Sequence, residues 1–202
     1  MAWTESVPYS SAVGRLKAAY DRVRSGTGQI DNILSVHSLR PHTLEGHMTL
    51  YKSVLHHSGN SLPLWLLEAL GVRVSLLNGC SYCVKHHLAG LRASVSQTAR
   101  VDLIQIALET GAFEPVFDVR CAALLRYADK LTSAPSSLIE DDLAELRAAG
   151  LNDGEILEAN QVVSYFAYAN RTVLGLGVTT DGEAHIGLSP RHSDQADDWR
   201  HE

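Results

Sequence analysis

Apolar residues recur at the three- and four-residue spacing of amphipathic helices through nearly the whole chain. In the first such segment they are Val13, Leu16, Tyr20 and Val23. The alternation typical of a strand is absent, except for a weak pattern in residues 183–188. We therefore predict an all-α, single-domain fold of about seven helices, for which a chain of 202 residues is long enough.

Proline, glycine and polar residues divide the helical pattern into segments. Pro41 and Pro63 are expected at helix starts, where a missing N–H has no consequence. Gly150 is expected to end a helix and Asn152 to cap the last long one. We predict three parts: an N-terminal helical segment packed on the core (1–62), a core that carries the cysteine motif (63–180) and a polar C-terminal tail (181–202).

The composition is that of an ordinary globular protein, with 45% hydrophobic and 20% charged residues. The net charge is −6 and no run of lysine or arginine is present, which argues against a nucleic-acid partner. The N-terminus lacks a basic region followed by an apolar run, and no apolar stretch approaches the ~18 residues of a spanning helix. We therefore expect a soluble, cytoplasmic protein without a membrane partner. In a reducing compartment, a Cys-x-x-Cys pair is expected to be redox-active, catalytic or metal-binding rather than a permanent disulfide.

The reactive side chains are concentrated in the sequence NGCSYCVKHHLAG, residues 78–90. The pair Asn78-Gly79 readily breaks a helix, so a new helix is expected to begin there with Cys80 in its first turn. The unpaired N–H groups and the dipole at a helix N-terminus favour a thiolate.

Three reactive residues share one face of this helix, because Cys80, Cys83 and His87 have the spacing i, i+3 and i+7. His86 points elsewhere. If the preceding helix packs against this one as a hairpin, Glu68 and His87 are nearly equidistant from the turn and lie level. A carboxylate, an imidazole and a thiol in that order form a proton relay that activates sulfur. In one unbroken helix, Glu68 would instead lie ~18 Å from Cys80 along the axis.

Other kinds of site fit the cysteine pair less well. A c-type haem needs histidine directly after the second cysteine, where Val84 stands, and a thioredoxin-like site needs a βαβ context. Zinc could take Cys80, Cys83 and His87, with Glu68 or a distant histidine as the fourth ligand, but no second cysteine pair completes a familiar motif. Burial of the two thiols as small apolar side chains also stays open. We favour redox chemistry, with neither a metal nor a cofactor.

The remaining polar residues give weaker signals. Cys121 lies on an apolar helix face and is expected to be a packing residue. His37, His42 and His47 recur in five-residue steps, which no single helical face accommodates. We therefore expect no site from these histidines.

The stretch LLEALGVRVSLLNGCSYCVKHHLAGL resembles the thiol-redox motif of the alkylhydroperoxidase AhpD-like branch of the carboxymuconolactone decarboxylase superfamily. The pattern there is a glutamate, a Cys-x-x-Cys twelve residues on, and a histidine four residues after the second cysteine, which Glu68, Cys80, Cys83 and His87 fit without a gap. The later stretch from LLRYADKL to VLGLGV is similar to the C-terminal half of the longer, peroxidase-related members. The resemblance covers roughly residues 12–178.

The resemblance implies reduction of hydroperoxides through a thiol–disulfide cycle, with an unknown thiol or dithiol as the reductant. It implies that Cys83 is the attacking thiolate, Cys80 the resolving thiol and Glu68 the base, acting through His87. The best-known members carry a histidine between the cysteines, where this chain has Tyr82. Tyrosine is a poor base near neutral pH. Tyr82 could still donate a hydrogen bond to a peroxide oxygen or a thiolate, as a possible accessory residue.

The resemblance also implies a homo-oligomer, commonly a trimer or hexamer. The sequence VVSYFAYANRTVLGLGV, residues 162–178, points the same way, because a helix that is apolar nearly all round needs cover from other protein.

Two other functions stay open. One is a redox-sensing oligomer without enzymatic activity, in which oxidation of Cys80 and Cys83 changes assembly. The other is a lyase or decarboxylase activity of the wider superfamily, which is disfavoured because such members do not need Cys-x-x-Cys.

Overall fold

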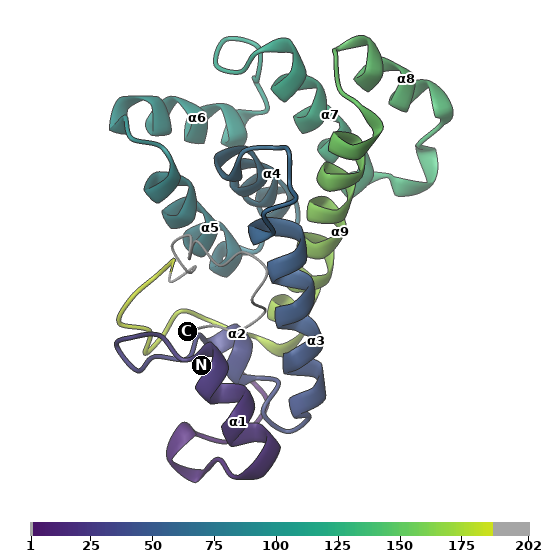
Figure 1. Cartoon of the computed structure of the whole chain (residues 1–202). Helices are drawn as coiled ribbons and strands as arrows, with labels where there is room; N and C mark the ends of the chain where they lie inside the picture. Colours follow the sequence, from purple (N-terminus) through teal and green to yellow (C-terminus); the bar gives the residue numbers. More distant parts are fainter. Residues whose placement is uncertain (1, 188–202) are drawn as a thin grey trace.

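The computed structural model describes residues 2–187, and this part of the chain folds into nine α-helices without a strand (Figure 1). In chain order the helices are α1 (Gly14–Val23), α2 (Asn32–Ser35), α3 (Pro41–Tyr51), α4 (Leu64–Leu77), α5 (Ser81–Ser94), α6 (Thr98–Thr110), α7 (Val119–Ser133), α8 (Glu140–Ala148) and α9 (Asp153–Leu176). Short 3-10 turns lie at Tyr9–Ser11 and Pro135–Ser137, and a π-helical turn at Lys52–His56 continues α3. The predicted all-α, single-domain fold is confirmed. The helices of the described part exceed the predicted number of about seven, and the two shortest are α2 with four residues and α8 with nine.

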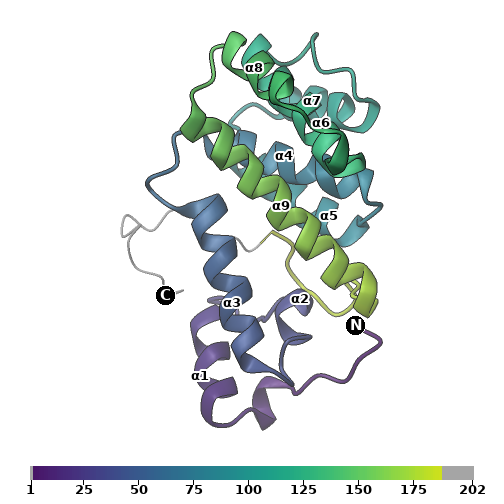
Figure 2. The same ribbon diagram turned by 90° about the vertical axis from the view of Figure 1, so that its right-hand side faces the viewer.

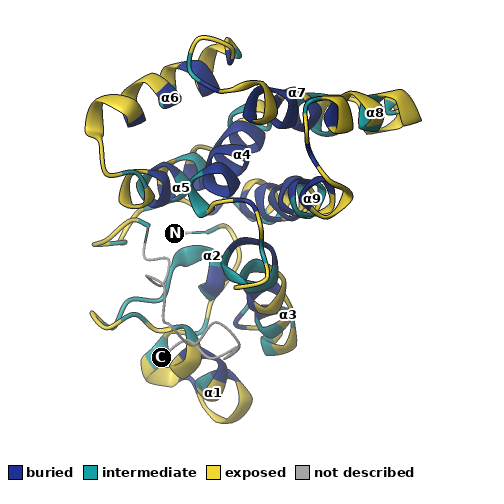
Figure 3. Cartoon of the chain, turned by 45° about the horizontal axis from the view of Figure 1, so that its top comes forward, coloured by how far each residue is buried: buried dark blue, intermediate teal, exposed yellow. Residues whose placement is uncertain are grey.

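The centre of the fold is α4, in which every residue from 66 to 75 is buried (Figure 3). A helix without a polar face must be enclosed by protein, and α5, α7 and α9 pack around it. Two charged residues are carried into this interior, Glu68 and Arg73. Arg73 is neutralised by Asp129 of α7 through hydrogen bonds of 2.6 and 2.7 Å. Glu68 belongs to the site described below.

Three hydrophobic clusters hold the described residues together. The largest is formed mainly by α4 to α9. A second joins α1, α2 and α3 through five large side chains: Leu16, Tyr20, Leu34, Leu44 and Met48. The third surrounds Cys80 and Cys83. Figure 1 shows α1 and α2 at one end of the molecule and α6 to α8 at the other, and Figure 2 shows α9 passing beside α3. The N-terminal segment therefore lies against one end of the core.

The local signals in the sequence mark helix ends correctly. Pro41 is the first residue of α3, and Pro63 directly precedes α4. Gly150 follows the end of α8 with φ +92°, a left-handed conformation that glycine adopts without strain. Asn152 caps α9 by accepting a hydrogen bond from the N–H of Glu155, whose carboxylate accepts from Asn152 N–H in return.

The residues after α9 do not all form a polar tail. Residues 179–187 turn back to the N-terminal segment, and Asn32 donates hydrogen bonds to the carbonyls of Thr179 and Asp181 at 2.7 and 3.1 Å. No strand forms over 183–187, so the weak alternation there has no structural counterpart in the described part. The predicted polar tail from 188 to 202 lies outside the described residues.

Gly71 of α4 lets the central helix approach α9 closely. A Cβ at this position would lie 2.2 Å from the ring of Phe166 in α9. We predict that Gly71→Ala lowers the free energy of unfolding by about 2 kcal/mol, the usual size of an overpacking strain. Gly46→Ala in α3 is the matched control, because its Cβ would meet nothing within 4 Å. The control should be neutral or raise stability by up to about 1 kcal/mol. Urea denaturation measures both, and equal effects of the two substitutions would contradict the packing argument.

Candidate active site

The predicted hairpin between α4 and α5 is present. Asn78 ends α4 and Gly79 turns the chain with φ +68°. Cys80 then occupies the N-cap position of α5, and its N–H donates to the carbonyl of Ser75 at 2.8 Å. The turn is tight because glycine adopts the left-handed conformation without strain. It sends α5 back along α4, and the two helices pack side by side.

The hairpin brings Glu68 to His87, as the equidistance from the turn predicted. The Glu68 carboxylate is 1% exposed, and its Oε2 lies 2.7 Å from Nδ1 of His87. Gly90 makes this possible, because a Cβ there would lie 2.6 Å from Glu68 Oε1. A carboxylate bound at Nδ1 holds the ring proton on that nitrogen. His87 therefore presents Nε2 with a lone pair, which is the form of a general base.

The two thiols of the motif are buried and in contact with each other. Cys80 is 0% exposed and Cys83 is 2% exposed, and both are reduced. A hydrogen bond from Cys83, backbone N–H groups of the first turn and Asn170 together lower the pKa of Cys80. The same hydrogen bond to Cys80, with burial, raises the pKa of Cys83. Of the two thiols, Cys80 at the helix N-terminus therefore gives up its proton more readily, and Cys83 holds its proton more firmly.

The two sulfurs also differ in their access from outside, and in this respect Cys83 is the favoured one. Cys83 lines a cleft of about 650 Å³, whereas Cys80 is not among its lining residues. His87 and Tyr51 also line the cleft. A molecule that enters therefore meets Cys83 and His87 before it can reach Cys80.

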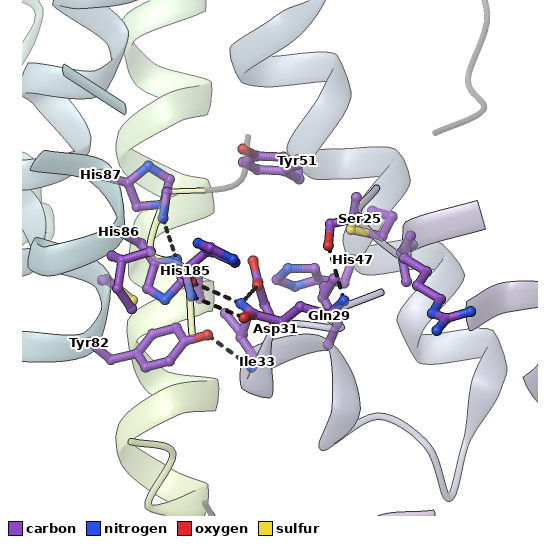
Figure 4. A pocket seen from close by; sticks show the side chains of 18 of the residues that line it. Ser25, Gln29, Asp31, Ile33, His47, Tyr51, Tyr82, His86, His87 and His185 are labelled. Carbon is purple, nitrogen blue, oxygen red and sulfur yellow. Dashed lines mark hydrogen bonds between the residues drawn. The ribbon is translucent and has the colours of Figure 1, made fainter. Parts of the chain in front are cut away.

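Tyr82 is oriented toward a distant carboxylate rather than toward the thiols. Its hydroxyl donates to Glu183 Oε1 at 2.7 Å. It accepts from the N–H of Ile33 at 3.2 Å (Figure 4). Burial, together with the charge of Glu183, raises the pKa of Tyr82. Its one proton is committed to Glu183, which leaves none for a thiolate or a peroxide. The possible accessory role of Tyr82 is therefore a structural one in this arrangement.

Glu183 belongs to a segment that closes one side of the cleft, residues 183–187, which we call the strap. The Glu183 side chain is 1% exposed, and its Oε2 lies 2.9 Å from Nε2 of His86. Its Oε1 also accepts from the N–H of Asn32 at 2.6 Å. Burial alone would raise the pKa of Glu183, but the hydrogen bonds from His86, Asn32 and Tyr82 outweigh it and lower the pKa below its usual range.

The rest of the strap is fixed by Gln29 and by a glycine. Gln29 Oε1 accepts from the N–H groups of Ala184 and His185 at 2.9 and 3.1 Å, and its Nε2 donates to the carbonyl of His185 at 2.8 Å. Gly187 has φ +75°, and a Cβ there would lie 2.6 Å from the side chain of Ala89 in α5. The strap is thus bound to the 29–33 segment on one side and to α5 on the other.

Several residues of the site were not expected from the sequence. His86 was expected to point away from the reactive face, yet it lines the same cleft as Cys83 and His87. The cleft is wide enough to contact residues on more than one face of α5. His47 was expected to contribute to no site, but it also lines the cleft. Asn170 holds the thiols from α9. No local pattern marks these residues, since each depends on a partner far away in the sequence.

No group of three or more His, Cys, Asp or Glu side chains suited to holding a metal ion occurs within residues 2–187. The zinc alternative would need such a group at Cys80, Cys83 and His87. Within the same range, no helix is long and apolar enough to cross a membrane.

Comparison with known proteins places the fold. Residues 41–124, which include the cysteine motif, match the model of the carboxymuconolactone decarboxylase family. A comparison with curated proteins found no match. Three similar solved structures share the fold at low sequence identity, and their names differ in what they say of activity.

The first is an uncharacterized peroxidase-related protein with an alkylhydroperoxidase AhpD core, from Ralstonia eutropha JMP134. It has a TM-score of 0.78 and 20% identity, over 94% of this chain and 98% of that one. The second is an uncharacterized peroxidase-related protein from Silicibacter sp. TM1040, with a TM-score of 0.73 and 22% identity over 93% of both chains. The third is a cysteine variant of the debrominase Bmp8 in complex with 2,3,4-tribromopyrrole, with a TM-score of 0.70 and 16% identity over 88% of this chain and 90% of that one.

The strap offers a test of the Glu183 network. The lowered pKa of Glu183 means that its carboxylate stabilises the docked strap above the ordinary carboxyl pKa of about 4.3, and that this contribution is lost as the pH falls through the lower folded value. Glu183→Gln cannot accept all the hydrogen bonds that the carboxylate accepts. We predict that amide hydrogen exchange over 183–187 becomes about tenfold faster at pH 7 in this variant and loses its acid-dependent step.

The matched control is Glu5→Gln, at an exposed position of the N-terminal segment. Its exchange over 183–187 should equal that of the wild type at every pH. If the Glu183→Gln protein also kept the wild-type exchange rates and the acid step, the carboxylate would not hold the strap.

Proposed function

We propose that this chain, whose residues 41–124 match the carboxymuconolactone decarboxylase family and whose fold is that of an AhpD-like protein, is a thiol-dependent peroxidase that cycles between the Cys80–Cys83 dithiol and its disulfide. The observation that carries the proposal is the hydrogen bond between Glu68 and His87, a carboxylate-fixed base that faces the same cleft as Cys83. A packing role alone gives no reason to bury a carboxylate beside an imidazole and two thiols.

In the proposed cycle, Cys83 is the sulfur that meets the hydroperoxide, since it lines the cleft. Its proton passes to Nε2 of His87 as the sulfur attacks the outer peroxide oxygen and the O–O bond breaks. The protonated ring, held by Glu68, gives the proton to the departing alkoxide, which leaves as an alcohol. Cys83 is then a sulfenic acid.

Cys80 completes the cycle as the resolving residue. Its thiolate attacks the sulfenic sulfur, the S–S bond forms, and hydroxide leaves with a proton from solvent as water. The dithiol has lost two electrons and the hydroperoxide has been reduced to an alcohol and water. An external thiol or dithiol of unknown identity then reduces the disulfide. The lowered pKa of Cys80 suits this second step, because it favours the thiolate form of the resolving sulfur.

The oligomer and the compartment belong to the proposal as well. Large apolar side chains are exposed on two helices, with Leu103 and Ile106 of α6 at 56% and 57% and Leu174 of α9 at 43%. Exposed apolar side chains on neighbouring turns favour burial against another copy. We propose a homo-oligomer, a trimer or hexamer, in the cytoplasm.

Steady-state turnover of cumene hydroperoxide with dithiothreitol tests the function against its alternatives. A peroxidase turns over repeatedly, and mass spectrometry after one equivalent shows a loss of two hydrogens mapped to Cys80 and Cys83. A redox sensor oxidises once, and a lyase does not react with the peroxide.

A reductive dehalogenase would release halide from a bromopyrrole instead. This alternative is suggested by the name of the debrominase neighbour and by a cleft far larger than a small peroxide needs. Cys121 serves as an internal control, because burial raises its pKa to about 12 and it should stay reduced.

The cysteine roles can be separated by single substitutions. We predict that Cys83→Ser abolishes peroxide-dependent turnover, because no sulfur then reaches the cleft. Cys80→Ser should trap a sulfenic acid on Cys83, because nothing is left to resolve it. Labelling with dimedone followed by mass spectrometry locates the sulfenic acid. A stable sulfenic acid on Cys80 in the Cys83→Ser protein would reverse the assignment.

We predict that Glu68→Gln slows oxidation of Cys83 about one hundredfold, the usual loss when a general base is disabled. Glutamine keeps the shape of the side chain, but it neither favours the Nδ1 proton nor stabilises the imidazolium of His87. Stopped-flow oxidation by cumene hydroperoxide measures the rate, and the pH dependence of iodoacetamide alkylation reports the ionisation of the pair. Glu109→Gln, at an exposed position of α6, is the control and should behave as the wild type. Superimposable rates and alkylation curves for Glu68→Gln would exclude the relay.

A further inference from the structure

The cleft contains a buried histidine that the thiol chemistry does not use. His47 of α3 is 4% exposed and lines the cleft. Figure 4 shows it with Tyr51 on one side of the cleft, across from Tyr82, His86 and His87 of α5. Burial, with smaller contributions from the neighbouring His37 and His87, lowers the pKa of His47 to about 3. The ring is therefore neutral at physiological pH and cannot offset a negative charge.

One nitrogen of His47 has a partner and the other has none. Its Nε2 lies 3.4 Å from the hydroxyl of Tyr165, which has no other hydrogen-bond partner among the described residues. The Tyr165 proton therefore points to Nε2, and the neutral ring carries its own proton on Nδ1. That N–H is buried and unpaired within the described part of the chain. Buried donors are nearly always satisfied in native proteins, because an unmade hydrogen bond costs the full desolvation of the group.

The adjacent histidine does not supply the missing acceptor. The rings of His37 and His47 pack with centroids 5.2 Å apart, but no hydrogen bond joins them. Thr43 donates its proton to the carbonyl of Arg40 at 2.8 Å, so Nδ1 of His37 must donate to Thr43 Oγ1, also at 2.8 Å. The Nε2 of His37 is then a second unpaired nitrogen, and His37 is not among the lining residues of the cleft.

We propose that Nδ1–H of His47 donates a hydrogen bond to an uncharged oxygen of the substrate, and that His47 thereby selects which substrates the cleft accepts. The favoured class is a ring-sized, neutral molecule with a carbonyl, ether or hydroxyl oxygen remote from the reacting group. A carboxylate is disfavoured at this nitrogen, because neutral His47 offers no countercharge there. The fixed charges of Arg24 and Asp31, which also line the cleft, are opposite in sign.

Aromatic side chains connect His47 to the thiols. The ring of Tyr165 packs on His47 with centroids 5.7 Å apart and on Tyr51 at 5.8 Å. Burial raises the pKa of Tyr165, and Cys83 is close enough to add to that shift. Because His47, Cys83 and Tyr165 all line the cleft, a ring seated along Tyr165 can contact His47 at one end and Cys83 at the other. The inference rests on the proposed function only in placing the reacting group of the substrate at Cys83.

The binding of three small molecules of similar size tests the hydrogen bond from His47 and requires no turnover. Acetophenone has an uncharged acceptor oxygen, ethylbenzene has none, and benzoate carries a charge. With reduced wild-type protein labelled with ¹⁵N-histidine, acetophenone should bind at least about tenfold more tightly than ethylbenzene or benzoate, the value of one buried hydrogen bond. It should also shift the Nδ1 resonance of His47 saturably. In His47→Leu the preference for acetophenone over ethylbenzene should disappear, whereas His42→Leu, an exposed position of the same helix, should keep it.

Three results would overturn the proposal. Wild-type protein could fail to distinguish acetophenone from ethylbenzene, as expected if only a water satisfies Nδ1. A ¹⁵N–¹⁵N coupling across a hydrogen bond could show that His37 takes the His47 proton. Acetophenone could bind equally tightly to His47→Leu. The first two measurements use wild-type protein, so they stand even if the variant does not fold. Oxidation of Cys83 by cumene hydroperoxide in His47→Leu separates the two hypotheses, since a reactive thiol there supports the peroxidase whatever the probes show.

Discussion

The hydrogen bond between Glu68 and His87 is the interaction around which the site is built. It places a carboxylate in the centre of the molecule, on the most deeply buried helix, where an unpaired charge would be unstable. It requires the left-handed turn at Gly79, which sends α5 back along α4, and the missing side chain at Gly90, which lets the two helices approach. The same bond fixes the tautomer of His87, so that the fold and the chemistry depend on one contact.

The two thiols divide between them the properties that a reactive sulfur needs. The pKa is lowered at Cys80, because the backbone N–H groups at the N-terminus of α5 and the hydrogen bond from Cys83 favour a thiolate there. Access lies with Cys83, because it lines the cleft and Cys80 does not. A nucleophile at Cys83 and a resolving thiol at Cys80 are consistent with this division.

The cleft in front of the thiols is assembled from parts of the chain that are distant in sequence. The strap reaches it from beyond α9 and is held by Glu183 through Tyr82, His86 and Asn32. Tyr82 thus connects the cysteine motif to the strap rather than to the Glu68–His87 pair. His47 enters from α3 on the other side. The motif supplies the reactivity, and these distant segments shape the space in which a substrate must fit.

The sequence by itself determined the helices, their ends at Pro41, Gly150 and Asn152, and the pairing of Glu68 with His87. Each of these follows from residues within about 20 positions of one another, where helical spacing and a turn of known geometry fix the distance. Only the tertiary structure decided that Asn170 would contact the thiols, that Glu183 would hold the strap against α5, and that His47 would contact Tyr165 and face the cleft with an unpaired nitrogen. These contacts join residues some 90 to 120 positions apart. Their geometry depends on how whole helices pack, and helix packing leaves no periodic signal in the residues that it brings together.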